Sequence, residues 1–177
     1  LANWDRATAA LADEPDLRDH IRLASAMLRG LPAILAGTAP ATQFMFPEGR
    51  FDLVNGVYHG NSVADFFNDL LADAVVSAVQ ARIADDPSVQ LRLVEVGAGT
   101  GGTARVLFRR LAPYAANIAE YRFTDLSKAF LITARQNFLK DAPYLQTEIF
   151  DVSKSPQDQG FAIGSYDIAV ATNVLHA

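Results

Sequence analysis

The chain has 177 residues, half of them apolar and 20% charged, a balance that allows a sizeable hydrophobic core. It contains no cysteine and only three histidines, so disulfides, cysteine nucleophiles and multi-histidine metal sites are not expected, and a reducing cytoplasm fits this composition. A net charge of −5 without a Lys/Arg cluster argues against a nucleic-acid partner, and no apolar run approaches the ~20 residues that cross a membrane.

An amphipathic helix is predicted near the N terminus. Its apolar stripe follows 4-3-4 spacing and comprises Leu17, Ile21, Ala24 and Leu28. Gly30 and Pro32 are helix-stop signals, so we expect the helix to end there. Trp4 and Leu11 indicate a shorter helix earlier in the chain. Packing against the rest of the protein explains this segment better than a direct binding role.

Residues 37–62 are predicted to form a connector, because glycine and proline recur along it. It contains Gly56-Val-Tyr-His-Gly-Asn61, in which aromatic and polar residues lie between glycines. A long loop of this kind is typical of a lid or binding loop. An ordinary surface crossing with Tyr58 as a buried anchor explains the same residues equally well.

A long helix is predicted from about Val63 to Ala84, ending before Asp85-Asp86-Pro87. Ser62 followed by Asp65 is a capping-box-like start for this helix. The apolar face that we expect comprises Phe67, Leu70, Leu71, Ala74, Val75, Ala78 and Val79. The helix leads into the first predicted strand.

Strands and helices alternate from residue 91 onward. The predicted elements are strand 91–96, helix 103–111, strand 120–124, a helix capped by Ser127 with Phe130, Leu131, Ala134 and Phe138 as its apolar residues, strand 145–150 and strand 166–172. Strands separated by single helices indicate the α/β class, with a doubly wound, Rossmann-like parallel sheet. We expect an N-terminal helical or lid region at residues 1–88 and a ligand-binding core at residues 89–177.

The chain stops at Ala177, directly after the fourth predicted strand. A four-stranded sheet would leave Ile168, Val170 and their neighbours at an open edge. We therefore expect the sequence to be a truncated part of a larger polypeptide, and the core to be incomplete at its C terminus.

A glycine-rich turn follows the first predicted strand in Val94-Glu-Val-Gly-Ala-Gly-Thr-Gly-Gly-Thr103. Gly97 and Gly99 allow a tight turn and close approach of a ligand, and Gly102 allows the next helix to pack closely. That helix's N terminus offers free N–H groups and the positive end of a dipole. A nucleotide-like ligand is predicted, although the G-x-G-x-x-G spacing also suits a nicotinamide dehydrogenase.

Acidic residues at the predicted strand ends favour S-adenosylmethionine over NAD as that ligand. Asp125 can accept from both ribose hydroxyls of either cofactor and does not discriminate between them, whereas Asp151 is placed to accept from an adenine amino group. A buried Glu95 needs donors or a cation, which the amino-acid end of a sulfonium cofactor could supply. The alternatives are that Asp125 caps the helix that begins near Ser127 and that Asp151 shapes a turn.

Four segments resemble the C-methyltransferase domain of modular polyketide synthases, a class I family that depends on S-adenosylmethionine. They are the loop Glu95–Thr103, Tyr121-Arg-Phe-Thr-Asp-Leu-Ser127, the Phe150-Asp151 pair and Ser165-Tyr-Asp-Ile-Ala-Val-Ala-Thr-Asn-Val-Leu-His-Ala177. Gly56–Asn61 and Asp65-Phe-Phe-Asn68 resemble the lid region that precedes the cofactor loop in that family. The closing Asn-Val-Leu-His-Ala is the most specific of these motifs.

The resemblance implies a role for each matching residue. The implied cofactor-binding residues are Glu95, Gly97, Ala98 and Gly99 for the methionine part, Asp125 with Leu126 for the ribose end, Asp151 with Val152 for the adenine, and Asn173 near the sulfur. His176 is implied as the general base, with Tyr58 of the lid region as a second catalytic residue. Without the resemblance, His176 would be interpreted as a strand-end histidine satisfied by backbone groups.

The implied reaction is methyl transfer to the α-carbon of a β-ketoacyl chain, which needs positioning and a base near neutral pH. The implied partners are an acyl carrier protein with a phosphopantetheine-tethered polyketide and the neighbouring synthase domains. Arg105, Arg109 and Arg110 are candidates for docking an acidic carrier, although a solvated helix face explains them too. O-methylation and a non-catalytic structural role remain as alternative functions.

Overall fold

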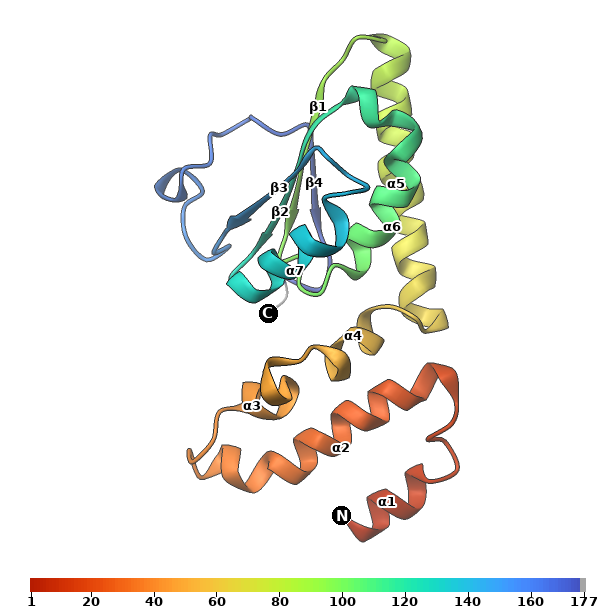
Figure 1. Ribbon diagram of the computed structural model, residues 1–177, viewed down its shortest axis with the longest axis vertical. Helices are drawn as coiled ribbons and strands as arrows, with labels where there is room; N and C mark the ends of the chain where they lie inside the picture. Colours follow the sequence, from red (N-terminus) through yellow and green to blue (C-terminus); the bar gives the residue numbers. More distant parts are fainter. Residues whose placement is uncertain (176–177) are drawn as a thin grey trace. The chain divides into compact units, whose positions relative to one another are not determined.

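The computed structural model describes residues 1–175, which divide into two compact units (Figure 1). The first unit comprises Leu1–Phe67 and the second begins at Asn68, so the boundary lies within helix α5 (Ser62–Asp85). No helix in this part of the chain is both long enough and apolar enough to cross a bilayer.

The first unit is helical throughout. Its elements are α1 (Ala2–Thr8), α2 (Pro15–Leu35), α3 (Ala41–Met45), the 3-10 turn η1 (Pro47–Gly49), α4 (Asp52–Tyr58) and the first turn of α5. Helix α1 is tied to α2 by the Trp4 indole, which donates to Ser25 Oγ at 2.8 Å, and by an ion pair of 2.7 Å between Arg29 and Asp5.

Helix α2 does not end at Gly30 and Pro32, as the sequence predicted, but continues to Leu35. Gly30 is buried, and a Cβ at this position would lie 2.5 Å from the Phe44 ring, so packing against α3 requires the glycine. The fixed φ of Pro32 is compatible with a helix, and the missing N–H of this proline removes only one backbone donor. The helix ends before Gly37, whose φ of 67° gives the left-handed turn common at helix ends.

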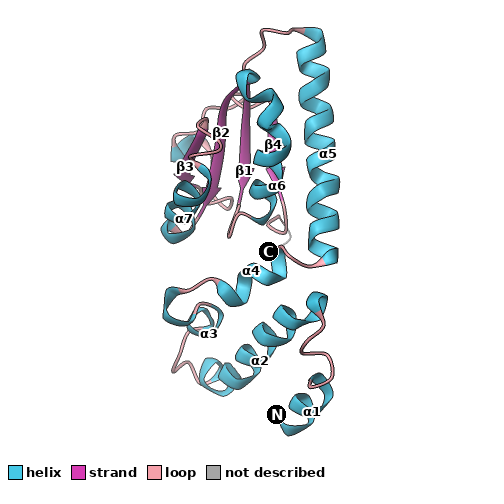
Figure 2. Cartoon of the chain, turned by 45° about the vertical axis from the view of Figure 1, so that its right-hand side comes forward, coloured by secondary structure: helices cyan, strands magenta, loops and turns pink. Residues whose placement is uncertain are grey.

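The predicted connector is largely helical, because α3, η1 and α4 form within it (Figure 2). Gly56 lies inside α4, where a Cβ would meet the Asp19 carboxylate of α2 at 2.1 Å. Close packing of two helices therefore explains a glycine that the sequence placed in a loop. Tyr58 is 44% exposed, so the buried-anchor interpretation is wrong. The lid interpretation stays a prediction.

The residue that caps the N terminus of α5 is Asn61 rather than Ser62. Asn61 is 4% exposed, and its Oδ1 accepts from the Ala64 N–H at 2.9 Å, as an N-cap side chain does. Asp65 reaches back to accept from the Gly60 N–H at 2.9 Å. Ser62 instead donates from its hydroxyl and its N–H to the two carboxylate oxygens of Asp16, at 2.6 and 2.7 Å.

The buried face of α5 differs from the predicted one. Its buried residues are Asn68, Ala72, Val75 and Val79. Val75 and Val79 were expected there, but Phe67 is 60% exposed and Leu70 is 55% exposed. The buried face is narrower than the sequence indicated, because only the side of α5 that carries Ala72, Val75 and Val79 packs into the core of the second unit.

The second unit contains a four-stranded parallel sheet in the order β3-β2-β1-β4 (Figure 2). Its elements are β1 (Leu91–Val96), α6 (Gly102–Leu111), the 3-10 helix η2 (Ala112–Asn117), β2 (Ile118–Asp125), α7 (Lys128–Phe138), β3 (Leu145–Ile149), the 3-10 turn η3 (Gln157–Gln159) and β4 (Ile168–Ala171). The predicted α/β class and parallel sheet are confirmed. Strand β4 lies at one edge, although Val170 is only 3% exposed.

One face of this sheet forms the hydrophobic core with α5, α6 and α7. Leu93 lies opposite Tyr121 in the β1–β2 register, and Glu95 lies opposite Phe123, so these side chains share that face. The Phe108 ring of α6 packs edge-on against Tyr121 at 4.7 Å between centroids. The helix α7 contributes the predicted buried residues Leu131, Ala134 and Phe138.

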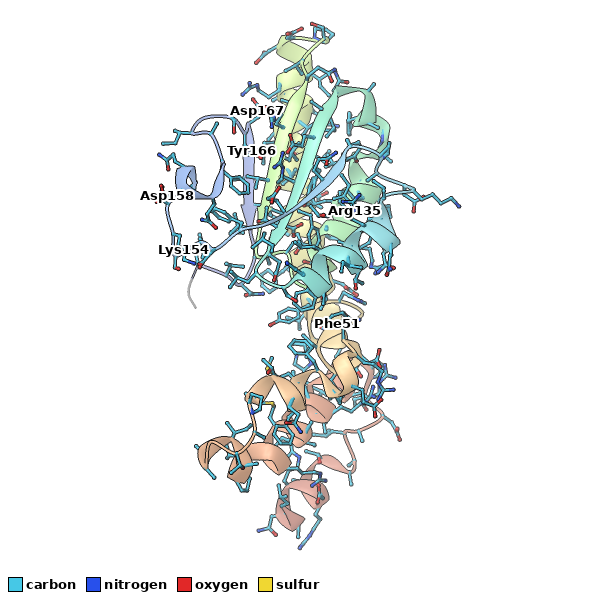
Figure 3. The ribbon with its side chains drawn as sticks, turned by 60° about the vertical axis from the view of Figure 1, so that its left-hand side comes forward. Phe51, Arg135, Lys154, Asp158, Tyr166 and Asp167 are labelled. Atoms are coloured by element: carbon cyan, nitrogen blue, oxygen red, sulfur yellow. The ribbon has the colours of Figure 1, made fainter. Side chains whose placement is uncertain are left out.

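The opposite face carries charged residues under the segment between β3 and β4. Arg92 pairs with Glu120 at 2.6 Å, and Arg122 also contacts Glu120. Tyr166, labelled in Figure 3, lies 5.3 Å from the Arg92 guanidinium, and Phe161 lies 5.8 Å from that of Arg122. Aromatic rings of this segment therefore cover the charged residues of this face.

Candidate functional site

The loop after β1 turns on three glycines with positive φ. Gly97, Gly99 and Gly101 have φ values of 62°, 56° and 79°, which side-chain-bearing residues rarely adopt. The backbone therefore reverses between β1 and α6 within a few residues. Gly101 is the N-cap residue of α6, a role that the sequence did not assign to it.

The three glycines face different surroundings. A Cβ at Gly97 would lie 2.4 Å from Val174, and one at Gly101 would lie 2.7 Å from the Phe138 ring. A Cβ at Gly99 would meet no heavy atom closer than the Gly97 carbonyl oxygen, 3.9 Å away. Protein packing therefore explains two of the glycines, and Gly99 is the one beside open space that a ligand can approach.

Asp125, the last residue of β2, holds this loop in place. Its Oδ2 accepts from the Gly99 N–H at 2.9 Å, and its Oδ1 accepts from the Ser127 N–H at 2.8 Å. The second bond matches the alternative that Asp125 organises the start of α7, whereas Ser127 itself makes no side-chain cap bond. A carboxylate has about four acceptor positions, so acceptor capacity remains for two ribose hydroxyls.

Glu95 is 1% exposed and receives its hydrogen bond from the protein. The Tyr121 hydroxyl donates to Glu95 Oε2 at 2.7 Å. Burial raises the pKa of Glu95 to about 8, opposed by the Tyr121 bond and reinforced by the nearby charge of Asp125. At neutral pH Glu95 is therefore mainly a neutral carboxyl group, and it does not depend on a cofactor cation for a partner as the sequence suggested.

Asp151 lies two residues beyond β3 and shapes its own turn, as the alternative interpretation proposed. Its Oδ1 accepts from the Ser153 hydroxyl at 2.6 Å and the Ser153 N–H at 3.0 Å, and Lys154 pairs with its Oδ2 at 3.0 Å. The Ser153 hydroxyl bond, the Lys154 bond and the Ser153 N–H lower the pKa of Asp151 to about 2. An adenine contact would have to use the acceptor capacity that remains.

The other predicted cofactor residues lie in the segments that follow the strands. Ala98 donates its N–H to the Thr124 carbonyl at 2.9 Å, which ties the glycine loop to β2. Leu126 is 66% exposed and Val152 is 49% exposed, so both offer apolar surface beyond β2 and β3. Asn173 follows β4 with a φ of 55°, an unusual backbone conformation for a residue with a side chain.

The two predicted catalytic residues are not brought together by the described part of the structure. Tyr58 belongs to the first unit, at the end of α4. His176 lies outside the described residues. His20 is exposed and His59 is half-buried.

The arginines proposed for carrier docking make contacts within the second unit. Arg109 pairs with Asp69 at 3.5 Å, Arg110 pairs with Asp73, and the Arg105 guanidinium lies 5.3 Å from the Phe138 ring centre. Arg105 and Arg109 nevertheless remain exposed, which fits the alternative that these residues belong to a solvated helix face.

Sequence reasoning missed two residues that shape the site. Tyr121 was assigned only to a strand, yet it is the hydrogen-bond partner of Glu95. Thr124 donates its hydroxyl to the Glu95 carbonyl at 2.7 Å while its own carbonyl accepts from Ala98. The predicted strand 120–124 reads Glu-Tyr-Arg-Phe-Thr, in which polar residues are common, so neither residue stood out.

Comparison with known proteins assigns this site to a class. Residues 94–177 match a family model described as a methyltransferase domain. The crystal structure of the DszA carbon methyltransferase aligns with a TM-score of 0.87 at 32% identity, over 97% of this chain and 44% of that one. Residues 94–177 thus match a methyltransferase domain in sequence, and the second unit has the class I, Rossmann-like methyltransferase fold.

The curated relatives that this chain matches are polyketide synthases, of which it spans only a small part. The chain is 44% identical over 174 residues to polyketide synthase PksM of Bacillus subtilis (strain 168), which is 98% of this chain and 4% of PksM. It also aligns with the trans-methyltransferase CalH, solved in complex with SAH, with a TM-score of 0.76 at 26% identity over 99% of this chain and 47% of that one. The predicted resemblance to polyketide synthase methyltransferase domains is confirmed.

Proposed function

We propose that this chain is the cofactor-binding part of an S-adenosylmethionine-dependent carbon methyltransferase in a polyketide synthase. The acceptor is the α-carbon of a β-ketoacyl chain on the phosphopantetheine arm of an acyl carrier protein. The methyl group that S-adenosylmethionine supplies is electrophilic because it is bonded to a sulfonium. The lid region lies within residues 1–88, of which the part from Asn68 onward belongs to the second unit, and the neighbouring synthase domains deliver and receive the substrate.

The observation that carries this proposal is the bond between Asp125 and Gly99. It places a carboxylate with spare acceptor capacity 2.9 Å from a backbone N–H whose glycine borders open space. A nucleoside with vicinal hydroxyls and a charged tail fits such a pairing of acceptor and backbone donor. The carbon methyltransferases DszA and CurJ support the acceptor type, with identities of 32% and 31%.

The chain's own residues then position the reactants. Gly99 and Ala98 shape the methionine end of the site, Asp125 orients the ribose, and Leu126 and Val152 offer apolar surface for the adenine. His176 accepts the acidic α-proton, because an imidazole titrates close to neutral pH and this carbon acid needs only a weak base. Asn173 and Tyr58 are proposed to contact the reacting end, with Tyr58 acting from the lid region.

Replacing Asp125 by Ala should weaken binding of S-adenosylhomocysteine by about tenfold or more, because a charged acceptor is lost from the ribose site. Calorimetry on the full-length protein measures this. Asp141→Ala, which removes an exposed acid just beyond α7, should leave the affinity unchanged. Undetectable binding of S-adenosylhomocysteine to the unmodified protein would refute the proposed function.

Replacing His176 by Ala should lower methylation of a carrier-bound β-ketoacyl substrate by about a hundredfold, because the α-proton loses its base. Binding of S-adenosylhomocysteine should stay the same in this variant. Mass spectrometry with fragmentation of the product locates the methyl group. A methyl group on oxygen, or full activity of the variant, would contradict the assignment of His176 as the base for carbon methylation.

A further inference from the structure

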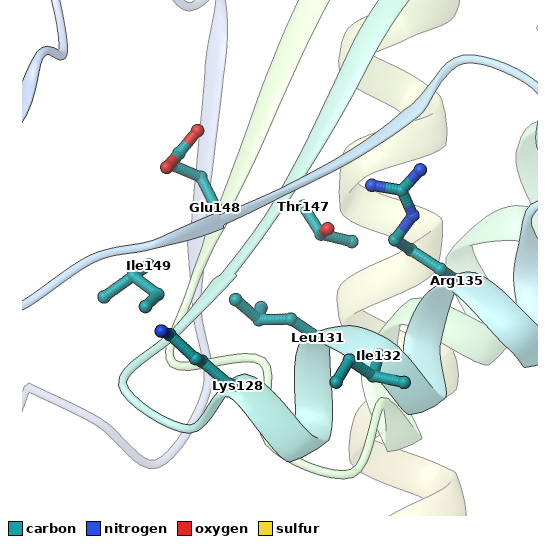
Figure 4. A pocket seen from close by; sticks show the side chains of 7 residues that line it. All are labelled: Lys128, Leu131, Ile132, Arg135, Thr147, Glu148 and Ile149. Carbon is teal, nitrogen blue, oxygen red and sulfur yellow. The ribbon is translucent and has the colours of Figure 1, made fainter.

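A pocket of about 280 Å³ lies between α7 and β3 (Figure 4). One side is formed by Lys128, Leu131, Ile132 and Arg135, which share a helix face at i, i+3, i+4 and i+7 spacing. The other side is formed by Thr147, Glu148 and Ile149 of β3. The pocket therefore combines a helix face with the edge strand of the sheet.

Exposed apolar surface forms the middle of this pocket. Ile132 is 57% exposed and Ile149 is 38% exposed, although both line a concave surface. Leu139, at the C-terminal end of α7, is also 40% exposed. Apolar side chains gathered around a hollow favour a partner that inserts an apolar group of its own.

The cations of the pocket are not neutralised by the chain. In residues 68–175, the Arg and Lys side chains for which no ion pair or aromatic contact is found are Lys128, Arg135 and Lys140, all on α7 or just after it. Glu148, the acid in the pocket, pairs with Arg122 at 3.6 Å. Two of these three cations of the second unit, Lys128 and Arg135, therefore line the apolar hollow.

The pocket also lies next to the proposed cofactor site. Ile149 is the register partner of Asp125, the residue that holds the glycine loop. Lys128 begins α7, three positions after Asp125 along the chain. A partner docked here would therefore be held at the same end of the parallel strands as the proposed reaction.

We propose that the pocket between α7 and β3 docks an acidic amphipathic helix of the acyl carrier protein. An apolar side chain of that helix inserts between Ile132 and Ile149, and its carboxylates pair with Lys128 and Arg135. This inference rests on the proposed function, which requires such a carrier, and it replaces the earlier candidate docking helix α6, whose arginines are occupied.

The test uses the full-length protein and a carrier protein loaded with a non-hydrolysable β-ketoacyl arm, with affinity measured by surface plasmon resonance. The double variant Lys128→Glu/Arg135→Glu should bind the carrier about tenfold more weakly, with a reduced dependence on salt. Ile132→Ser should also weaken binding, which a purely long-range charge effect would not produce. Arg6→Glu is the charge control from the first unit and should bind normally.

Binding of S-adenosylhomocysteine in the same variants separates this inference from the proposed function. Unchanged cofactor affinity with weakened carrier binding supports the docking site. Unchanged carrier affinity in both pocket variants overturns it, even when the unmodified protein methylates normally. A change in self-association, measured by sedimentation, with carrier affinity unchanged would identify the pocket as a contact between copies of the chain and would also overturn the inference.

Discussion

Replacing Gly101 by Ala is expected to lower the free energy of unfolding by about 3 kcal/mol. Part of this cost arises because Gly101 has a φ of 79°, where a Cβ adds strain of ~1 kcal/mol. The larger part arises because that Cβ would lie 2.7 Å from the Phe138 ring, which is 6% exposed and packs against Phe108. Urea unfolding followed by circular dichroism measures the difference.

Gly99→Ala is the matched control, because it adds the same methyl group to the same loop. Its φ of 56° costs a similar ~1 kcal/mol, but the new Cβ would meet nothing closer than 3.9 Å. We therefore expect a small loss of stability and a larger loss of affinity for S-adenosylhomocysteine. Combining Gly101→Ala with Phe138→Leu should recover part of the stability. Equal destabilisation by the two glycine variants would contradict the division of roles.

The stability of the protein is expected to fall as pH rises from about 5 to about 8, because of Glu95. Its pKa is raised from an ordinary value of 4.5 to about 8 in the folded state. The folded protein therefore retains a proton that the unfolded chain releases within this range. Glu95 contributes its full stabilisation at pH values below its pKa in the unfolded chain. This stabilisation is lost as the pH rises toward its pKa in the folded protein, and the free energy of unfolding falls by up to about 1.4 kcal/mol per pH unit.

Glu95→Gln tests this dependence, since the amide has a similar shape and no titration. The variant should show a flatter stability profile across the range, measured by urea unfolding at a series of pH values. Glu148→Gln changes a half-exposed glutamate on β3 and should retain the slope of the unmodified protein. The depressed pKa of Asp151 acts at lower pH and does not affect this range. An unchanged slope in Glu95→Gln would show that another group causes it.

The second unit was more predictable from sequence than the first. Strand β1 was predicted at its observed bounds, and the buried residues of α7 were identified, because alternating elements with short connections leave few arrangements. In the first unit, Gly30 and Gly56 were interpreted as local breaks. They are helix residues at close contacts with Phe44 and Asp19, which only the tertiary structure reveals.

The positions of the candidate site residues along the strands could be predicted from the sequence, but their hydrogen bonds could not. Asp125 was placed at a strand end correctly, yet its bonds to Gly99 and Ser127 depend on loop geometry that spacing does not encode. Tyr121 lies 26 positions from Glu95 and meets it only through the strand register. The pattern G-x-G-x-x-G directed attention to Gly102 and away from Gly101, the glycine that packing against Phe138 requires.

The two bonds of Asp125 have a consequence for engineering this protein. The side chain that is proposed to bind the ribose also holds the backbone of two segments, through the Gly99 and Ser127 N–H groups. Ligand preference and local architecture are therefore not separable at this position. A redesign for a cofactor with a modified ribose would therefore retain Asp125 and alter Leu126 or Val152, whose side chains are exposed.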